Sequence, residues 1–379
     1  MLLTPRLAKK RGHHPVMLFI LLVAILVIAV GLWLRHPQYA APEVSVAANT
    51  ANYRDGQFYN DPQYAPLHPA PATNTSRWAL WYQFLFGKDP GSIPDQAIPS
   101  QKTDLLQLDP REDVIVWMGH SSYFIQLNGL RFLIDPVFSP GASPVPGTNR
   151  AFAGSSVYQA ADIPQIDYLL ISHDHWDHLD YPSVKALKDK IRHIVTPTGV
   201  GSYFRKWGFP ADSISEGHWF SALSRPGVDI HILPTRHFSG RLLERNQTLW
   251  GSFALVTPGK RIYLGGDSGY GRHFAAIYRY LGPVDVAILE CGQYDANWAS
   301  IHMTPEQTAQ AADDLHAAAV LPAHNSKFKL AHHTWRDPLE RISNASSGKA
   351  WRLMTPKIGQ SVSLTDTRQT FTPWWREKP

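Results

Sequence analysis

The stretch Ser172-His173-Asp174-His175-Trp176-Asp177-His178-Leu179-Asp180 brings three histidines within six residues. Side chains spaced this closely cannot all face one side of a helix or a strand, so we expect them to converge on a cation from a loop. Imidazole and carboxylate groups together suit zinc, manganese or iron, and a catalytic zinc site keeps one position open for water. The alternative is a solvated surface loop, because a histidine-rich tract without partners reflects composition alone.

Apolar, strand-like segments lead into this stretch and into three further candidate ligands. Residues 168–172 read as a buried strand that runs into His173, and a helical pattern follows at residues 181–190. Residues 229–234, 261–266 and 318–323 are similar segments, and they lead to His237, Asp267 and His324. Rigid strands aim side chains more accurately than mobile loops do. We therefore expect a layered α/β fold whose strand ends gather these side chains into two metal sites at one edge of its sheets.

The pattern HxHxDH, followed by a distant His, Asp and His, resembles the signature of the metallo-β-lactamase-fold hydrolases. The resemblance implies a four-layer αββα sandwich that binds two Zn²⁺ ions. It also implies a ligand for each position of the signature. These are His173, His175 and His237 at one zinc, Asp177, His178 and His324 at the other, and Asp267 bridging both.

Further stretches are similar to one branch of this family, the N-acylphosphatidylethanolamine-hydrolysing phospholipase D enzymes and their bacterial relatives. The stretches span about residues 57 to 335. They are Val116-Trp117-Met118-Gly119-His120-Ser121-Ser122, Ile134-Asp135-Pro136-Val137-Phe138-Ser139, His237-Phe238-Ser239-Gly240-Arg241, Leu249-Trp250-Gly251-Ser252-Phe253 and Gly265-Gly266-Asp267-Ser268-Gly269-Tyr270-Gly271.

Two stretches depart from the branch. The chain has His324-Asn325-Ser326-Lys327-Phe328 where the branch usually has a His-Trp-Gly-Thr-Phe-like run. The strand-like residues 284–289 end in Glu290, where the relatives tend to be apolar. Glu290 either reaches the site as a carboxylate that supports the metal ligands without binding the metal, or it simply ends a strand. The metal is therefore better defined by the sequence than the substrate is.

The ligand set implies hydrolysis by a metal-bridging hydroxide. Two divalent metals roughly 3.5 to 4 Å apart share a water and lower its pKa from about 15.7 toward 7. Asp177 would bind a metal and accept a hydrogen bond from the hydroxide. Further along the chain, Thr304-Pro305-Glu306-Gln307 has the pattern of a helix capping box, which places His302 at the entrance to a helix.

Two histidines outside the signature are candidates for other roles. The related lipases place a histidine near the substrate phosphate, so His302 is the candidate to stabilise charge or protonate the leaving group. The alternative is a solvent-facing loop histidine. His120 either orients a metal ligand or makes a structural hydrogen bond to the backbone.

The N-terminal region predicts a membrane anchor. Residues 16–34 form an uncharged run of 19 apolar or small residues, close to the roughly 20 that a transmembrane helix needs. More basic residues precede the run than follow it, so the positive-inside rule places the N-terminus in the cytoplasm and the rest outside, in the periplasm of a Gram-negative cell. The competing interpretation is a cleaved signal peptide, whose apolar core is usually about 7 to 15 residues long.

Composition supports the remaining organisation. The single cysteine, Cys291, cannot form an internal disulfide, and 379 residues can build a core without one. A net charge of +5 gives no case for a nucleic-acid partner. We expect a cytoplasmic basic tail (1–15), a transmembrane anchor (16–34), a proline-rich linker and fold-packing extension (35–110), and a hydrolase domain (111–379). Residues 78–86 are rich in aromatic side chains and of helical length, and we expect them either to pack on the domain or to meet lipid.

The leading hypothesis is a membrane-anchored dinuclear-zinc phosphodiesterase of phospholipase D type that cleaves a lipid or lipid-like substrate. The membrane contact is through the N-terminal helix. One alternative is a metal-dependent lactonase or other carboxylic-ester hydrolase that shares the fold. The other is a non-catalytic, zinc-binding envelope protein, which the complete set of seven ligands disfavours.

Overall fold

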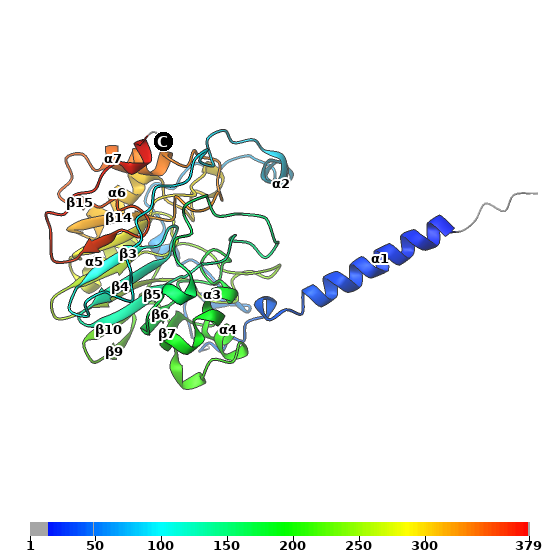
Figure 1. The fold of residues 1–379 in the computed structure, drawn as a ribbon, viewed down its shortest axis with the longest axis horizontal. Coiled ribbons are helices and arrows are strands. Elements are labelled where there is room, and N and C mark those ends of the chain that lie inside the picture. The colour runs from blue at the N-terminus through cyan, green and yellow to red at the C-terminus, as the bar shows by residue number, and fades with distance from the viewer. Residues whose placement is uncertain (1–13, 48, 378–379) are drawn as a thin grey trace, which may run out of the picture. The chain divides into compact units, whose positions relative to one another are not determined.

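A computed structural model describes residues 14–47 and 49–377, and these residues fall into two compact units that divide between residues 41 and 42. The first unit contains α1 (His14–Trp33), the long blue helix of Figure 1, and a short 3₁₀ helix (Pro37–Tyr39). By length and composition alone, Pro15–Trp33 could cross a membrane. The expected cytoplasmic tail, with its basic residues, lies mostly outside the described residues.

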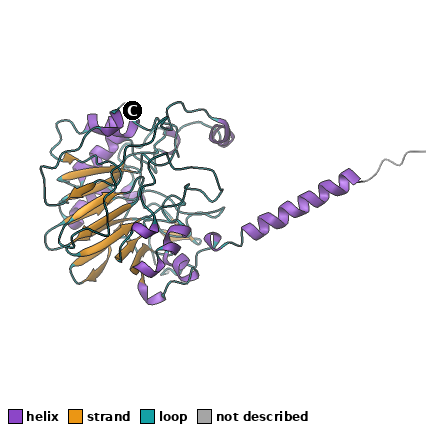
Figure 2. Cartoon of the chain, in the orientation of Figure 1, coloured by secondary structure: helices purple, strands orange, loops and turns teal. Residues whose placement is uncertain are grey.

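The second unit is built on two mixed seven-stranded sheets (Figure 2). Four strands of each sheet pair antiparallel, and the strands that follow pair parallel. The first sheet runs in the order β16 (Ser361–Ser363), β3 (Val114–Trp117), β4 (Tyr123–Leu127), β5 (Leu130–Ile134), β6 (Ile166–Leu170), β7 (Ile191–Pro197), β8 (Ile214–Gly217). The second runs β15 (Arg352–Leu353), β14 (Ala319–Ala323), β13 (Val286–Glu290), β12 (Arg261–Leu264), β11 (Ser252–Val256), β10 (Val228–Leu233), β9 (Ser221–Arg225).

Helices cover the outer faces of both sheets. They are α3 (Tyr181–Ala186), α4 (Gly201–Lys206), α5 (His273–Leu281), α6 (Pro305–Asp314) and α7 (Asp337–Ala345). Outside these layers lie α2 (Arg77–Phe86) and a small hairpin of β1 (Tyr53–Arg54) and β2 (Gln57–Phe58).

Successive side chains along a strand enter opposite faces of its sheet, and the described residues form three large cores between four layers. Ile115 and Trp117 join the core between the sheets, whereas Val116 joins the core under α3 and α4. A third core lies between the second sheet and α5, α6 and α7, and it includes Val320 of β14 and Ile342 of α7. Both faces of each sheet are covered, which is why the strands read as continuous apolar runs. The expected αββα sandwich is confirmed.

The observed elements refine the expected ones. The strands expected before His173, His237, Asp267 and His324 are β6, β10, β12 and β14. The helical pattern at 181–190 is divided into α3 and a 3₁₀ turn (Lys188–Lys190), a common way for a helix to tighten at its end. Residues 42–110 belong to the same compact unit as the sheets. The C-terminal tail docks on the domain, because Trp374 and Trp375 are buried.

Candidate metal centre

The ends of β6, β10, β12 and β14 bring the distant candidate ligands to one place, and the loop after β6 supplies the others. His173, His175 and His237 form one group of potential ligand atoms that lie within 4.8 Å of one another. His175 Nδ1 lies 2.9 Å from His173 Nε2 and 3.2 Å from His237 Nε2. These three residues are the ones that the sequence assigns to the first zinc.

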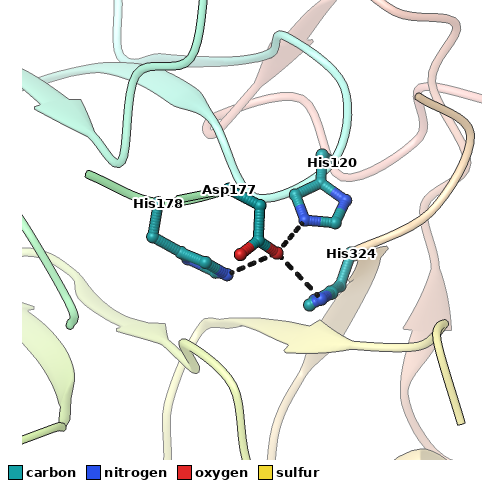
Figure 3. A group of neighbouring side chains, drawn as sticks. All are labelled: His120, Asp177, His178 and His324. Carbon is teal, nitrogen blue, oxygen red and sulfur yellow. Dashed lines mark hydrogen bonds and ion pairs between the residues drawn. The ribbon is translucent and has the colours of Figure 1, made fainter. Parts of the chain in front are cut away.

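A second group lies beside the first and contains His120, Asp177, His178 and His324 (Figure 3). Asp177 Oδ2 is at its centre, 2.8 Å from His120 Nε2, 3.3 Å from His178 Nε2 and 3.7 Å from His324 Nε2. Three of the four residues are those that the sequence assigns to the second zinc, and His120 is the addition.

Asp267 lies between the two groups. Its Oδ2 is 3.9 Å from His173 Nε2, 3.6 Å from His237 Nε2 and 3.2 Å from His178 Nε2. Its Oδ1 is 3.0 Å from His324 Nδ1. One carboxylate therefore contacts both groups, as a bridging ligand must.

The protonation chemistry of these groups suits divalent cations. Burial lowers the pKa of His173, His175 and His237, that of His175 to about 4, so these rings are neutral at pH 7. Burial raises the pKa of Asp267, but the charge of His178 outweighs it and keeps the carboxylate ionised. Nε2 of His175 is buried without a hydrogen-bond partner among the described residues. A neutral imidazole nitrogen left in this state can serve as a metal ligand.

Asp135 supports the second group from behind and was missed as a functional residue. It follows β5 directly, and its carboxylate accepts hydrogen bonds from Ser172 N (2.8 Å) and Ser172 Oγ (2.6 Å). It also lies 2.7 Å from His178 Nδ1. This contact orients the His178 ring so that Nε2 faces Asp177 and Asp267. A carboxylate immediately after a buried strand is the same signal that identified Asp267.

His120 combines both roles that the sequence leaves open. Its φ of 51° places it in the left-handed region, and its backbone pairs with the turn after β14 through His120 N to Asn325 O (3.1 Å) and His324 N to His120 O (2.9 Å). Its ring contacts Asp177 directly. Burial lowers the pKa of His120 to about 3, so the neutral ring donates to the carboxylate through Nε2.

Glu290 and His302 form a buried pair at the edge of the centre. Glu290 Oε2 lies 2.9 Å from His302 Nδ1, and Oε1 accepts a hydrogen bond from Met303 N (2.6 Å). The His302 ring lies 5.1 Å from that of His237 and 5.2 Å from that of His324, between centroids. Burial lowers the pKa of His302, but the charge and hydrogen bond of Glu290 outweigh it and raise the pKa above its usual value.

This pair resolves two alternatives. His302 is not a solvent-facing loop residue, because its side chain is only 12% exposed. Glu290 contacts the site through His302, although the sequence favours a strand cap.

Asp174 and Arg241 hold the histidine-rich loop in place. Asp174 accepts hydrogen bonds from Gly240 N (2.7 Å), Tyr203 Oη (2.8 Å) and Thr248 Oγ1 (2.8 Å). Arg241 Nη1 donates to the carbonyls of Asp174 and Leu179. The loop after β6 is thereby attached to the loop after β10, which carries His237.

Comparison with known proteins agrees with this geometry. The Beta-lactamase superfamily domain matches residues 130–325. The chain belongs to the metallo-β-lactamase superfamily. It is 35% identical over 366 residues to an uncharacterised protein of Mycobacterium tuberculosis, covering 92% of this chain and 96% of that one. It is 30% identical over 274 residues to N-acyl-phosphatidylethanolamine-hydrolyzing phospholipase D 1 of Caenorhabditis elegans, covering 66% of this chain and 75% of the relative.

The fold also matches solved structures. The diiron β-hydroxylase CmlA from Streptomyces venezuelae superposes with a TM-score of 0.52 at 18% identity, covering 68% of this chain. The chain spans about half of the hydroxylase, 55% of its length. This likeness concerns the fold alone. Together, the family match, the relatives and the histidine and aspartate clusters identify a metal-dependent hydrolase of this superfamily, related to the N-acylphosphatidylethanolamine-hydrolysing phospholipases D.

Proposed function

We propose that this metal-dependent hydrolase is a dinuclear-zinc phosphodiesterase of phospholipase D type that acts on a lipid or lipid-like substrate. The observation that carries the proposal is the position of Asp267 between a three-histidine group and the group around Asp177. The relationship to the Caenorhabditis elegans phospholipase D supports the lipid substrate.

In this proposal, His173, His175 and His237 would hold one cation, Asp177, His178 and His324 would hold the other, and Asp267 would serve both. Two bound divalent cations would activate a water and polarise the phosphoryl oxygens. Zinc suits these donors, because imidazole and carboxylate are its usual ligands in catalytic sites. Iron is the competing metal, since the structurally similar hydroxylase is a diiron protein.

Two side chains of the protein, Asp177 and His302, are proposed to accept or donate hydrogen bonds and protons during the reaction. Asp177 Oδ2 lies at the centre of the second group, where it would accept a hydrogen bond from the attacking water. His302 binds the substrate phosphate or donates a proton to the leaving oxygen. Glu290 holds His302 Nδ1, so Nε2 is the nitrogen available to the substrate.

We also propose that residues 16–34 anchor the protein in a membrane, with residues 1–15 in the cytoplasm and the hydrolase domain (111–379) outside, joined by residues 35–110. The length and apolar composition of α1 support this arrangement. Protease added to intact spheroplasts should digest the domain, whereas protection until the cells are lysed would place the domain in the cytoplasm.

The test of the function uses the full chain purified in detergent. Metal analysis should find close to two zinc ions per chain, and most of this metal should be lost in Asp267→Ala. The zinc-loaded protein should hydrolyse N-acylphosphatidylethanolamine and bis-p-nitrophenyl phosphate. A protein that turns over only a lactone panel would be an ester hydrolase. One that cannot be loaded with metal would be a non-catalytic scaffold.

A further inference from the structure

A surface cavity of about 340 Å³ lies outside the groups described above. One wall is the proline-rich segment formed by Pro66 and residues 68–73. The other walls carry most of the polar side chains. They come from loops that connect the strands of the second sheet and from α6, which packs on this sheet. Their principal side chains are Arg236, Tyr270, Asn297, Ser300 and Gln307.

Arg236 brings a positive charge to this cavity that the described part of the protein does not neutralise. Nη1 donates to the Tyr270 carbonyl (2.8 Å), and the buried Nε has no hydrogen-bond partner. Among the described residues, no carboxylate oxygen lies within 4.0 Å of the Arg236 guanidinium, so Arg236 forms no ion pair with them. A guanidinium has five N–H donors, and a partly buried cation without an anion is unfavourable. The cavity is therefore complementary to an anionic group.

Asn297 adds an acceptor to the same cavity. Its backbone N and its Nδ2 both donate to Asp295 Oδ1, at 2.9 and 2.8 Å, which establishes the orientation of the amide. Asn297 Oδ1 is buried and has no partner within the described chain. Because this oxygen is shielded from the cavity, a ligand hydroxyl would reach it once the Asn297 side chain turns toward the ligand, and would then supply the missing donor.

The cavity adjoins the metal centre along the chain. Arg236 precedes the candidate ligand His237, and Ser300 lies two residues before His302. The two segments are joined where His237 Nδ1 lies 3.2 Å from the Ile301 carbonyl. A ligand in the cavity is thus in a position to affect both His237 and His302.

We propose that this cavity binds a small phosphate ester that also carries a hydroxyl group, with Arg236 contacting the phosphate and Asn297 accepting from the hydroxyl. The ester comes either from a lipid head group or from a soluble metabolite. The inference does not rest on the proposed phosphodiesterase activity, because it requires binding without bond cleavage.

The experiment measures binding of sn-glycerol 3-phosphate to the metal-loaded full chain by calorimetry. We expect Arg236→Gln to weaken this binding at least tenfold. Asn297→Asp, which keeps the size of the side chain but adds a negative charge, should weaken it similarly. The matched control is Arg272→Gln, because Arg272 is exposed and donates to the Ala65 carbonyl next to the same segment. The affinity of Arg272→Gln for sn-glycerol 3-phosphate should stay within twofold of that of the wild type.

Any binding to the metal ions themselves would persist in Arg236→Gln and so would appear as an Arg236-independent component. Equal affinities for the wild type, Arg236→Gln and Asn297→Asp would overturn the proposal, and so would an equal loss in Arg272→Gln. Displacement by phosphatidylglycerol in mixed micelles would identify a lipid head group as the source, and no displacement a soluble ester. Arg236-dependent binding in a protein that cleaves no phosphodiester would remove the proposed function but keep this site.

Discussion

Asp135 and Glu290 each hold the Nδ1 side of a histidine ring, so that the opposite nitrogen faces the centre of the site. Such contacts orient a ring and establish its tautomer. They differ in what the ring is proposed to do. Asp135 orients the candidate ligand His178, whereas Glu290 orients His302, which is proposed to act on the substrate. Changes at the two carboxylates should therefore have different consequences.

At Asp135 the expected consequence is loss of metal. Asp135→Asn removes the charge that holds His178 Nδ1, so we expect metal affinity to fall about 10- to 100-fold. Chelator competition measures this affinity. Asp180→Asn is the control, because the buried Asp180 carboxylate accepts hydrogen bonds from Ser139 and Ser183 and belongs to neither ligand group. Equal affinity in the wild type and Asp135→Asn would contradict the assigned role.

At Glu290 the expected consequence is loss of turnover with the metal retained. Glu290→Gln keeps an acceptor for Met303 N but weakens the contact with His302, so kcat should fall by about 10²-fold while KM changes little. Steady-state kinetics and metal analysis test this together. Glu306→Gln in α6, an exposed residue that pairs with Arg341, should leave kcat unchanged. A Glu290→Gln enzyme that has lost its metal would instead make Glu290 part of the metal site.

At the scale of elements, the site depends on where strands end and where α6 begins. Parallel neighbours such as β12, β13 and β14 end at the same edge of the second sheet, which gathers Asp267, Glu290 and His324. The start of α6 is determined locally by a capping box in which Gln307 N donates to Thr304 Oγ1 (3.3 Å) and Thr304 N donates to Gln307 Oε1 (3.0 Å). His302 lies two residues before the cap residue Thr304.

The cap of α6 should therefore affect both stability and turnover. Thr304→Ala should lower the free energy of unfolding by about 1 kcal/mol and reduce kcat, because the first turn of α6 frays next to His302. Denaturant unfolding and kinetics measure the two effects. Ser76→Ala removes the corresponding cap of α2, where Ala79 N donates to Ser76 Oγ, and should not change kcat. If Thr304→Ala and Ser76→Ala had the same kcat, the cap of α6 would have no role in positioning His302.

At the scale of the whole molecule, Lys327 joins loops from the two sheets. It follows β14 of the second sheet, and its buried Nζ donates to the Val137 carbonyl (2.9 Å) in the loop after β5 of the first sheet. Burial lowers the pKa of Lys327 from 10.5 to about 8. This lysine stands in one of the stretches that depart from the related lipases, and it links the two halves of the sandwich.

The lowered pKa predicts a pH dependence of stability. Between pH 8 and 10 the unfolded chain keeps the Lys327 proton that the folded protein releases, so the free energy of unfolding should rise with pH. Below pH 8 Lys327 is protonated in both the folded and the unfolded state. The full cost of burying its charge then lowers the free energy of unfolding. From pH 8 to 9.5 we expect a gain of about 1–2 kcal/mol in the wild type that Lys327→Met lacks. Urea unfolding at both pH values tests this, and parallel pH dependences would contradict it.

The sequence by itself determined the features that depend on short spacing. The HxHxDH loop, the apolar runs before His237, Asp267 and His324, and the capping box are local patterns, and the resemblance that the signature carries implied the fold. Only the tertiary structure decided which side chains support the site. His120 meets Asp177 across 57 positions and Asp135 meets His178 across 43. Arg236 shares a cavity with the distant residues 68–73. These partners are brought together by the order of strands in the sheets, which a local pattern does not encode.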